Sequence, residues 1–307
     1  KRFPYDYIAE AIDQTRGWFY TLHVLGVLLF NKPTYKHVIC AGHVVDEKGG
    51  KMSKSKGNII KPDDIINKTG VDAVRLQFCT TDIGNPKRFS YALMKEEVIP
   101  FLTILQNCYM YYQQLGHKKS KETIEDRWII SKLHTLTKEV ETLLETYQIP
   151  EALQKIMQFV VNDFSRSYIK IIRERDDSKE VVGTILKTIS LLLAPFAPYI
   201  SEYIYQDFSK ESVHLSLWPS SNKKKINLKL EKEFTTVFEI IEKGLAERDT
   251  IKIGLKWPLG NAFIVSNKKI SSELIALLKN QLNVKHIALK VGKDISVALN
   301  ATMTPEL

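Results

Sequence analysis

The sequence has 307 residues, and 44% of them are hydrophobic, which is enough for two or three domains that each bury a core. Lysine and arginine number 44 against 35 aspartates and glutamates, and this excess of +9 favours a polyanionic partner. No apolar run is long enough to form a membrane-spanning helix. Cys40, Cys79 and Cys108 lie far apart, which argues against a zinc site or a disulfide scaffold and favours a reducing, cytoplasmic setting.

The first ninety residues alternate between strand and helix patterns. Residues 5–8 read as a strand, and residues 13–29 carry a helical apolar stripe that Asp13 is placed to cap. Residues 37–45 read as a buried strand, and helices are expected from Pro62 to Gly70 and over 73–78. This order predicts a parallel α/β sheet, which binds ligands at the carboxyl ends of its strands.

Long helices follow from residue 90 and predict a bundle. A polar, basic linker at 220–225 then leads to one amphipathic helix with Phe234 and Ile241 on its apolar side, and to a small α/β unit with strands at 262–265 and 286–291. We therefore expect domains over 1–88, 89–220 and 221–307. The bundle helices are expected at 90–115, 123–147, 150–173, 179–193 and 196–208.

One basic loop stands out, Lys51-Met52-Ser53-Lys54-Ser55-Lys56-Gly57-Asn58. Four lysines and no acid fall between residues 51 and 61, and the loop is flanked by glycines that let the backbone bend. Such a loop suits a ligand whose negative charge is spread over several oxygens, such as a triphosphate. Composition alone favours a solvated face or a localisation or nucleic-acid patch, and the loop is not a Walker loop.

The order of the residues favours the first interpretation. Lys-Met-Ser-Lys-Ser matches the signature loop of class I aminoacyl-tRNA synthetases in all five positions. The chain resembles the second half of an isoleucyl-tRNA synthetase catalytic domain followed by its anticodon-binding bundle. The segments that carry the resemblance are EAIDQTRGWF (10–19), GHVVDEKGGKMSKSKGN (42–58), LLLAPFAPYISEYIY (191–205) and GLKWPL (254–259).

The resemblance implies half of a Rossmann-like nucleotide-binding fold, a helical anticodon-binding domain and a small α/β junction unit. It also implies an isoleucine–tRNA ligase that uses ATP to form isoleucyl-adenylate and transfers the amino acid to tRNA(Ile). Lys51 and Lys54 would act on the phosphates, where cations count most in the transition state. Mg²⁺ is expected on the ATP phosphates, with no metal site in the protein itself. The other residues implied at the ATP and adenylate site are Gly42, His43, Met52, Ser53 and Ser55.

The same resemblance assigns roles near the first strand. Asp13 would hold the ribose hydroxyls, Gln14 would orient the aminoacyl group with Glu10 beside them, and Trp18 would form a wall of the isoleucine pocket. Taken singly, Asp13 reads as a helix cap, and Trp18 reads as core together with Leu22 and Leu25.

The bundle would bind the anticodon stem and loop. Arg166, Lys170 and Arg173 fall on one face of the expected helix and are the candidates to hold tRNA phosphates, with Arg175 close by. A solvated face is an equally good interpretation. The tyrosines at 109, 111 and 112 are interpreted as packing rather than base stacking.

Two departures from the family pattern limit what the chain is expected to do. Ala11 stands where the family commonly has glycine. The His-Ile-Gly-His signature is absent, and the most similar segment, Ala41-Gly42-His43, follows a different strand. We therefore expect a part of a longer, monomeric enzyme that does not form adenylate alone. The rival interpretations are a valyl-tRNA synthetase, a non-catalytic tRNA-binding module and a polybasic membrane-surface protein.

Overall fold

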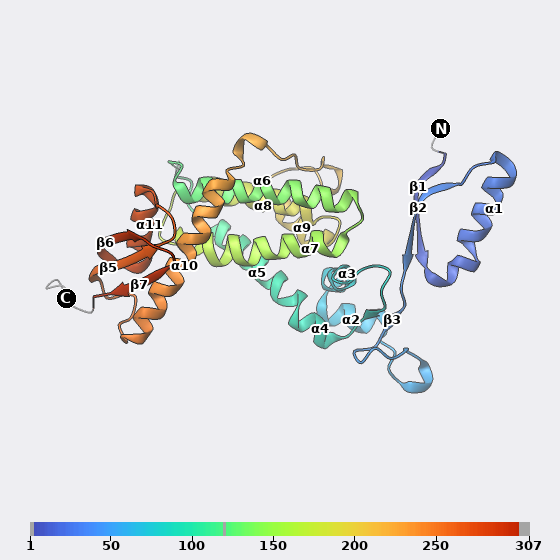
Figure 1. The fold of residues 1–307 in the computed structure, drawn as a ribbon. Helices are drawn as coiled ribbons and strands as arrows, with labels where there is room; N and C mark the ends of the chain where they lie inside the picture. The colour runs from blue at the N-terminus through green and yellow to red at the C-terminus, as the bar shows by residue number, and fades with distance from the viewer. Residues whose placement is uncertain (1–2, 119–120, 301–307) are drawn as a thin grey trace. The chain divides into compact units, whose positions relative to one another are not determined.

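The computed structural model describes residues 3–118 and 121–300 (Figure 1). The chain divides into two compact units, and each unit is built from three segments that alternate along the sequence with those of the other. The first unit comprises Lys1–Leu115, Leu136–Arg166 and Val182–Ser220, and the second comprises Gly116–Thr135, Ser167–Val181 and Ser221–Leu307. No helix in the described part of the chain has the length and apolarity needed to cross a membrane.

The first unit begins with the predicted strand–helix–strand arrangement. Strand β1 (Tyr5–Ala11) pairs in parallel with β2 (Tyr35–Ala41), and helix α1 (Trp18–Phe30) connects them (Figure 1). Glu10 lies opposite Cys40 and Ala11 opposite Ala41, so both strands end at the same edge. The segments that begin at residues 12 and 42 therefore leave the sheet side by side.

The prediction that Asp13 caps a helix over 13–29 was wrong. Residues Ile12–Arg16 form a 3₁₀ helix, and α1 begins only after Gly17. The oxygen that accepts from the first backbone N–H of α1 is Oε1 of Gln14, 3.1 Å from the nitrogen of Trp18. Gly17 leaves room for this contact, because an added Cβ would lie 2.7 Å from that Gln14 oxygen and would displace the Gln14 side chain.

The predicted strand 37–45 is interrupted at Gly42. The backbone N–H of Gly42 donates to the carbonyl of Ile83 at 2.8 Å, and a Cβ at this position would lie 2.4 Å from the carbonyl oxygen of Asn85. Two chain segments therefore cross at a distance that only glycine permits. Strand β3 (Val44–Val45) resumes after the crossing and pairs in parallel with β4 (Lys87–Arg88).

The two helices that follow the basic loop confirm the sequence signals. Helix α2 (Pro62–Thr69) has proline at its first position and two aspartates in its first turn, and it ends at Gly70, whose φ is 77°. Helix α3 (Val71–Cys79) follows directly.

The predicted long helices form, with two differences. Residues 90–115 make two helices, α4 (Tyr91–Glu96) and α5 (Val98–Gln114), because Pro100 has no N–H to donate to the carbonyl of Glu96. Residues 150–173 make α7 (Ile149–Gln158), which continues as a π-helix over Phe159–Ile169. The remaining helices are α6 (Ile124–Glu145), α8 (Lys179–Leu193) and α9 (Pro198–Tyr205), with a 3₁₀ turn at Val213–Leu215.

Two polar residues of α3 hold the turn between α8 and α9. The buried carboxylate of Asp72 accepts from the backbone N–H groups of Ile200 at 2.7 Å and Tyr199 at 3.3 Å, and so caps α9 from another helix. The guanidinium of Arg75 donates to the carbonyls of Pro195 and Phe196 at 2.9 and 3.2 Å. The interpretation of Tyr109 as packing is confirmed, since it is buried and its hydroxyl donates to Asp207.

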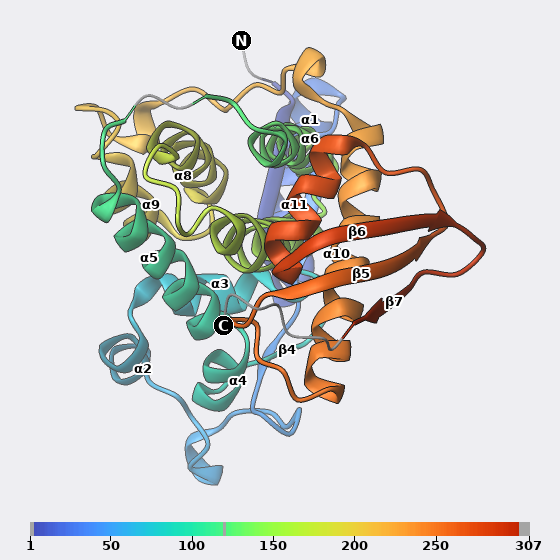
Figure 2. The same cartoon turned by 90° about the vertical axis from the view of Figure 1, so that its left-hand side faces the viewer.

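The second unit contains the small α/β fold that the sequence predicts (Figure 2). Strand β5 (Leu259–Ser266) lies between β6 (Val284–Val291), which is parallel to it, and β7 (Ser296–Leu299), which is antiparallel and was not predicted. Helices α10 (Leu228–Thr250) and α11 (Ser272–Leu282) pack on the sheet, and a short 3₁₀ turn at Lys223–Lys225 precedes α10. Trp128 of α6 stacks on Phe234 of α10 at 4.7 Å between ring centroids.

Candidate nucleotide site

The basic loop is held by a network centred on Asp46. The Oδ1 atom of Asp46 accepts from the backbone N–H groups of Gly50 at 2.6 Å and Lys48 at 3.1 Å, and Gly49 takes a φ of 84°. These bonds close a tight turn just before the lysines. Hydrogen bonds from Asn58 and then Gly50 lower the pKa of Asp46.

Asn58 closes the other end of the loop. Its Nδ2 donates to Oδ2 of Asp46 at 2.7 Å and to the carbonyl of Lys51 at 3.2 Å. Its Oδ1 accepts from the backbone N–H of Ser53 at 2.9 Å. The Asp46–Asn58 pair therefore ties residues twelve positions apart, and the segment between them forms one closed loop.

The lysine side chains of the loop take no part in this network. Lys51 and Lys54 are exposed, and neither forms an ion pair with a carboxylate within the described ranges. The hydroxyls of Ser53 and Ser55 lie 3.1 Å apart, and Gly57 has a φ of 64° with open space around it. The loop thus offers three exposed lysines, Lys56 included, and two neighbouring hydroxyls from a base that the Asp46–Asn58 pair closes.

The residues predicted near the first strand lie at the carboxyl edge of β1 and β2. Asp13 is exposed, and its Oδ2 accepts from Nε2 of Gln14 at 2.9 Å. Glu10 is exposed at the end of β1, and His43 is exposed two residues after β2. The parallel register brings these segments to one edge, where ligands of such sheets bind.

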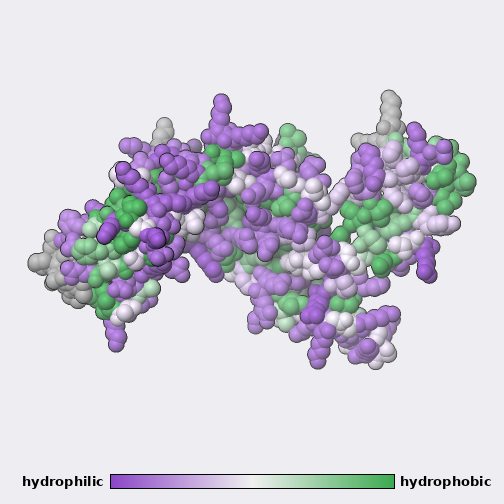
Figure 3. Space-filling model, viewed as in Figure 1, coloured by the Kyte–Doolittle hydropathy of each residue, from purple (hydrophilic) through white to green (hydrophobic). Residues whose placement is uncertain are grey.

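Trp18 is 48% exposed, and Leu25 is 52% exposed, so neither belongs to a core in the described residues. Only Phe19 and Gly26 of α1 are buried. Apolar residues are prominent on the surface of α1 in the space-filling view (Figure 3). They include Leu25, Val27, Leu28, Leu29 and Phe30.

The structure does not link the two halves of the predicted site by direct bonds. Among the described residues, no hydrogen bond or ion pair joins residues 12–18 to residues 51–58. The described residues also contain no group of three or more His, Cys, Asp or Glu side chains that could hold a metal ion.

The candidate tRNA contacts have different surroundings. Arg166 lies in the π-helix and is exposed, and Lys170 and Arg173 are exposed in the second unit. Arg175 has a structural role instead: it forms ion pairs with Asp126 at 3.0 Å, Glu125 at 3.1 Å and Asp177 at 2.9 Å.

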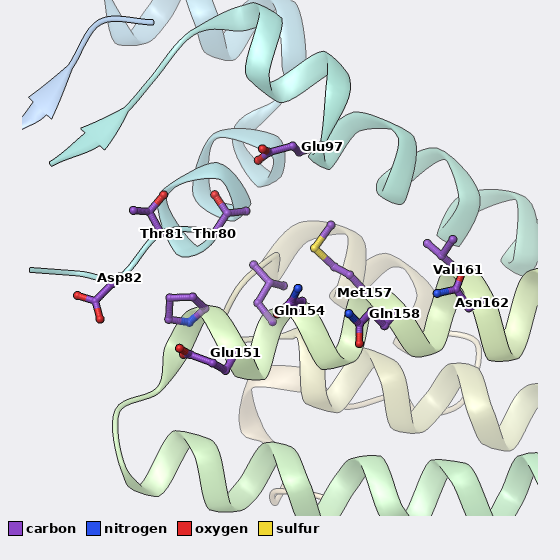
Figure 4. A pocket seen from close by; sticks show the side chains of 12 residues that line it. Thr80, Thr81, Asp82, Glu97, Glu151, Gln154, Met157, Gln158, Val161 and Asn162 are labelled. Carbon is purple, nitrogen blue, oxygen red and sulfur yellow. The ribbon is translucent and has the colours of Figure 1, made fainter. Parts of the chain in front are cut away.

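A cavity of about 750 Å³ lies between the end of α3 and helix α7 in the first unit (Figure 4). Three carboxylates line it, from Asp82, Glu97 and Glu151, and no lysine or arginine does. Its charge is wrong for the phosphates of ATP, so the exposed loop remains the better nucleotide candidate.

The sequence did not indicate the structural roles of Asp46, Asp72 and Arg175, although Arg175 was named beside the tRNA candidates. The turn at Asp46 carries a usable signal, because an aspartate three residues before a pair of glycines favours a turn that the side chain closes. Asp72 and Arg175 carry no such signal, since their partners lie 127 and 49 residues away.

Two family models match the chain. The model of class I tRNA synthetases (I, L, M and V) covers residues 1–90, and the model of the anticodon-binding domain of tRNA ligase covers residues 126–264.

Curated relatives match across nearly the whole chain. The isoleucine–tRNA ligase of Clostridium tetani is 35% identical over 100% of this chain and 32% of its own length. That of Dehalococcoides mccartyi is 36% identical over 94% of this chain and 32% of its own length, and isoleucine–tRNA ligase 2 of Bacillus cereus is 35% identical over 97% and 31%. The chain therefore spans about a third of the length of these relatives.

The solved structure of a LeuRS–tRNA–LeuAMS ternary complex from Agrobacterium radiobacter shares the fold. It superposes with a TM-score of 0.58 at 22% identity and covers 73% of this chain and 29% of its own. This likeness shows the fold. The two family models and the curated relatives show that the chain belongs to the class I tRNA synthetases, as part of the catalytic domain followed by an anticodon-binding domain.

Proposed function

We propose that the chain is part of an isoleucine–tRNA ligase, which activates isoleucine with ATP and transfers it to tRNA(Ile). The names of the curated relatives support isoleucine over valine. The observation that carries the proposal is the Asp46–Asn58 pair, which closes the loop on which Lys51 and Lys54 are exposed.

The chemistry asked of the loop is electrostatic. The isoleucine carboxylate attacks the α-phosphorus of ATP, the bond to pyrophosphate breaks, and negative charge accumulates on the leaving group. The ammonium groups of Lys51 and Lys54 would neutralise that charge, and the Ser53 and Ser55 hydroxyls would donate to phosphate oxygens. Met52, which is half-buried, would anchor the loop beside the nucleotide.

The edge of β1 and β2 would hold the rest of the adenylate. Asp13 has free acceptor capacity for two ribose hydroxyls, because Gln14 occupies only one of its oxygens. Gln14 is itself fixed by Trp18 and Asp13, which suits a residue that orients the aminoacyl group. Glu10, Gly42 and His43 would complete this edge, and the exposed ring of Trp18 would line the isoleucine pocket.

Mg²⁺ would bind to the phosphates of ATP rather than to a dedicated set of protein side chains. Mg²⁺ commonly binds through substrate phosphates with few protein ligands. In this proposal the metal neutralises phosphate charge, and the protein contributes the two lysines.

The anticodon arm of tRNA(Ile) would bind the helical part of the chain. Arg166, Lys170 and Arg173 would contact phosphates, in line with the anticodon-binding family model. We further propose a monomer in the cytoplasm, with the division 1–88, 89–220 and 221–307 as the functional domains. The three cysteines are unpaired, as a reducing compartment requires.

An ATP–pyrophosphate exchange assay with a panel of amino acids tests the proposal. The full-length protein should support exchange with isoleucine and far less with valine, and the 307-residue chain alone should support none. Preference for valine would identify the rival synthetase. Absence of exchange with every amino acid, together with retained tRNA binding, would identify a non-catalytic binding module.

A further inference from the structure

A basic hollow in the second unit, defined here by Lys229, Lys232, Lys268 and Lys269, has no role in the function proposed above. It has a volume of about 670 Å³ and lies between the start of α10 and the start of α11. All four lysines are exposed. Glu233 is the one carboxylate among its lining residues, so four positive charges face one negative charge.

These lysines lack partners that would account for their gathering. Within the described ranges, none of the four forms a salt bridge or a side-chain hydrogen bond. Like charges around one hollow repel each other, and the repulsion weakens folding unless an anion or solvent ions offset it. A bound anion would convert this repulsion into attraction.

The lysines of the hollow lie close to the starts of two helices. Lys229 is the second residue of α10, and Lys268 and Lys269 come just before the Ser271 cap of α11. Helix starts favour acidic residues because their free N–H groups carry partial positive charge. Each of the two first turns also carries an acid, Glu231 in α10 and Glu273 in α11, so the lysines add positive charge beside that preference and do not replace it.

The shape of the site favours an extended ligand. The hollow is open, and the exposed lysines of the turn Lys223–Lys225 precede α10 and lengthen the basic surface along the chain. Lysine binds phosphate as a flexible point charge, and a contact to phosphate carries no information about the base sequence. A repeating polyanion fits this arrangement better than a single compact one.

We propose that the basic hollow binds the phosphodiester backbone of RNA. The choice of RNA over another phosphate ligand rests on the function proposed above, but the hollow lies outside the Arg166, Lys170 and Arg173 set. It therefore provides a second, sequence-independent contact from the C-terminal α/β fold.

The test measures binding of a labelled tRNA transcript to the 307-residue chain by fluorescence anisotropy across a salt series. The variant is Lys232→Ala with Lys269→Ala, and the control is Lys252→Ala with Lys290→Ala, which removes equal charge from exposed positions of the same unit. Two lost phosphate contacts should flatten the slope of log K against log salt by about 1.4 to 1.8 and weaken binding roughly tenfold or more at about 0.1 M salt. The control should stay within about threefold of the parent chain.

Each outcome decides between the alternatives. Equal losses in the variant and the control would overturn the site, since net charge alone would then explain binding. Binding of inorganic tripolyphosphate that the variant abolishes, with tRNA binding unchanged, would assign the hollow to a free phosphate ligand and overturn the RNA assignment. Failure of the parent chain to bind tRNA at all would count against the proposed tRNA partner and the hollow together, whereas tRNA binding that the variant leaves intact would overturn the hollow alone.

Discussion

Asp126→Asn is expected to be the most destabilising conservative change in the second unit. Asp126 is 1% exposed at the start of α6, and both of its oxygens are bonded. The guanidinium of Arg175 donates to both oxygens of Asp126, at 3.0 Å to Oδ2 and 3.1 Å to Oδ1. The hydroxyl of Tyr168 also donates to Oδ1, at 2.5 Å. Its carboxylate also accepts from the backbone N–H of Thr123 at 3.0 Å, which is half of a capping box.

The size of the loss in unfolding free energy follows from the interactions that remain after Asp126→Asn. Removing one partner of a buried ion pair costs about 3–5 kcal/mol, because the other charge loses its compensation. Arg175 would keep Glu125 at 3.1 Å and Asp177 at 2.9 Å, and asparagine would keep one acceptor oxygen. The lower end of the range, about 3 kcal/mol, is therefore expected.

Urea denaturation followed by circular dichroism measures the loss. Asp6→Asn is the matched control, because Asp6 pairs with Lys36 at 3.0 Å with both side chains largely exposed, and such pairs contribute about 0–1 kcal/mol. A loss below about 1 kcal/mol for Asp126→Asn, or one equal to the control, would refute the reasoning.

The same residue gives a pH dependence with a definite sign. Burial acts to raise the pKa of Asp126, but the hydrogen bonds from Arg175 and Tyr168 outweigh it, and the pKa is lowered. The contribution of the carboxylate is therefore complete above the unfolded value of about 3.9 and is lost as the pH falls through the folded value. The stability gap between the parent chain and Asp126→Asn should shrink on acidification below about 3.9, and a gap that widened there would contradict the assignment.

Three further changes test the loop, the strand crossing and the RNA contacts. Asn58→Ala removes three hydrogen bonds from the loop, so the amide of Ser53 should exchange with solvent roughly tenfold faster by mass spectrometry, and unchanged exchange would show that the loop is held otherwise. Gly42→Ala should cost about 1–3 kcal/mol in urea unfolding, while Gly254→Ala, with open space around it, should cost almost nothing; equal effects would argue against the close crossing. Charge reversal of Lys170 and Arg173 together should weaken tRNA binding and flatten its salt dependence, and unchanged affinity would remove both from the interface.

The sequence predicted the features that depend on local signals. Pro62 and Gly70 mark the ends of α2, and the alternation of patterns gave the parallel pair of β1 and β2. The predictions of these features were correct because the backbone preferences of proline and glycine act within a few residues.

Features set by distant partners could not be predicted. Asp13 looked like the helix cap, but a glycine four residues later leaves room for the Gln14 side chain to take that role. Asp72 looked like an ordinary first-turn acid, yet it caps α9 across 128 residues of sequence. A single sequence contains no signal for either pairing.

The residues of the candidate site stay a prediction from the sequence, and the structure adds the geometry of the loop. The order of residues 51–58 identified the loop, and Lys51 and Lys54 are exposed as a phosphate ligand requires. The Asp46–Asn58 pair, which fixes the loop, became visible only in the structure.

The central claim is that Lys51 and Lys54 stabilise the departing pyrophosphate. Isoleucine-dependent ATP–pyrophosphate exchange by the full-length protein, with and without Lys51→Ala and Lys54→Ala together, measures this most directly. The account predicts a fall in the exchange rate of about a hundredfold or more with little change in the KM for isoleucine. An exchange rate within about threefold of the parent enzyme would contradict it.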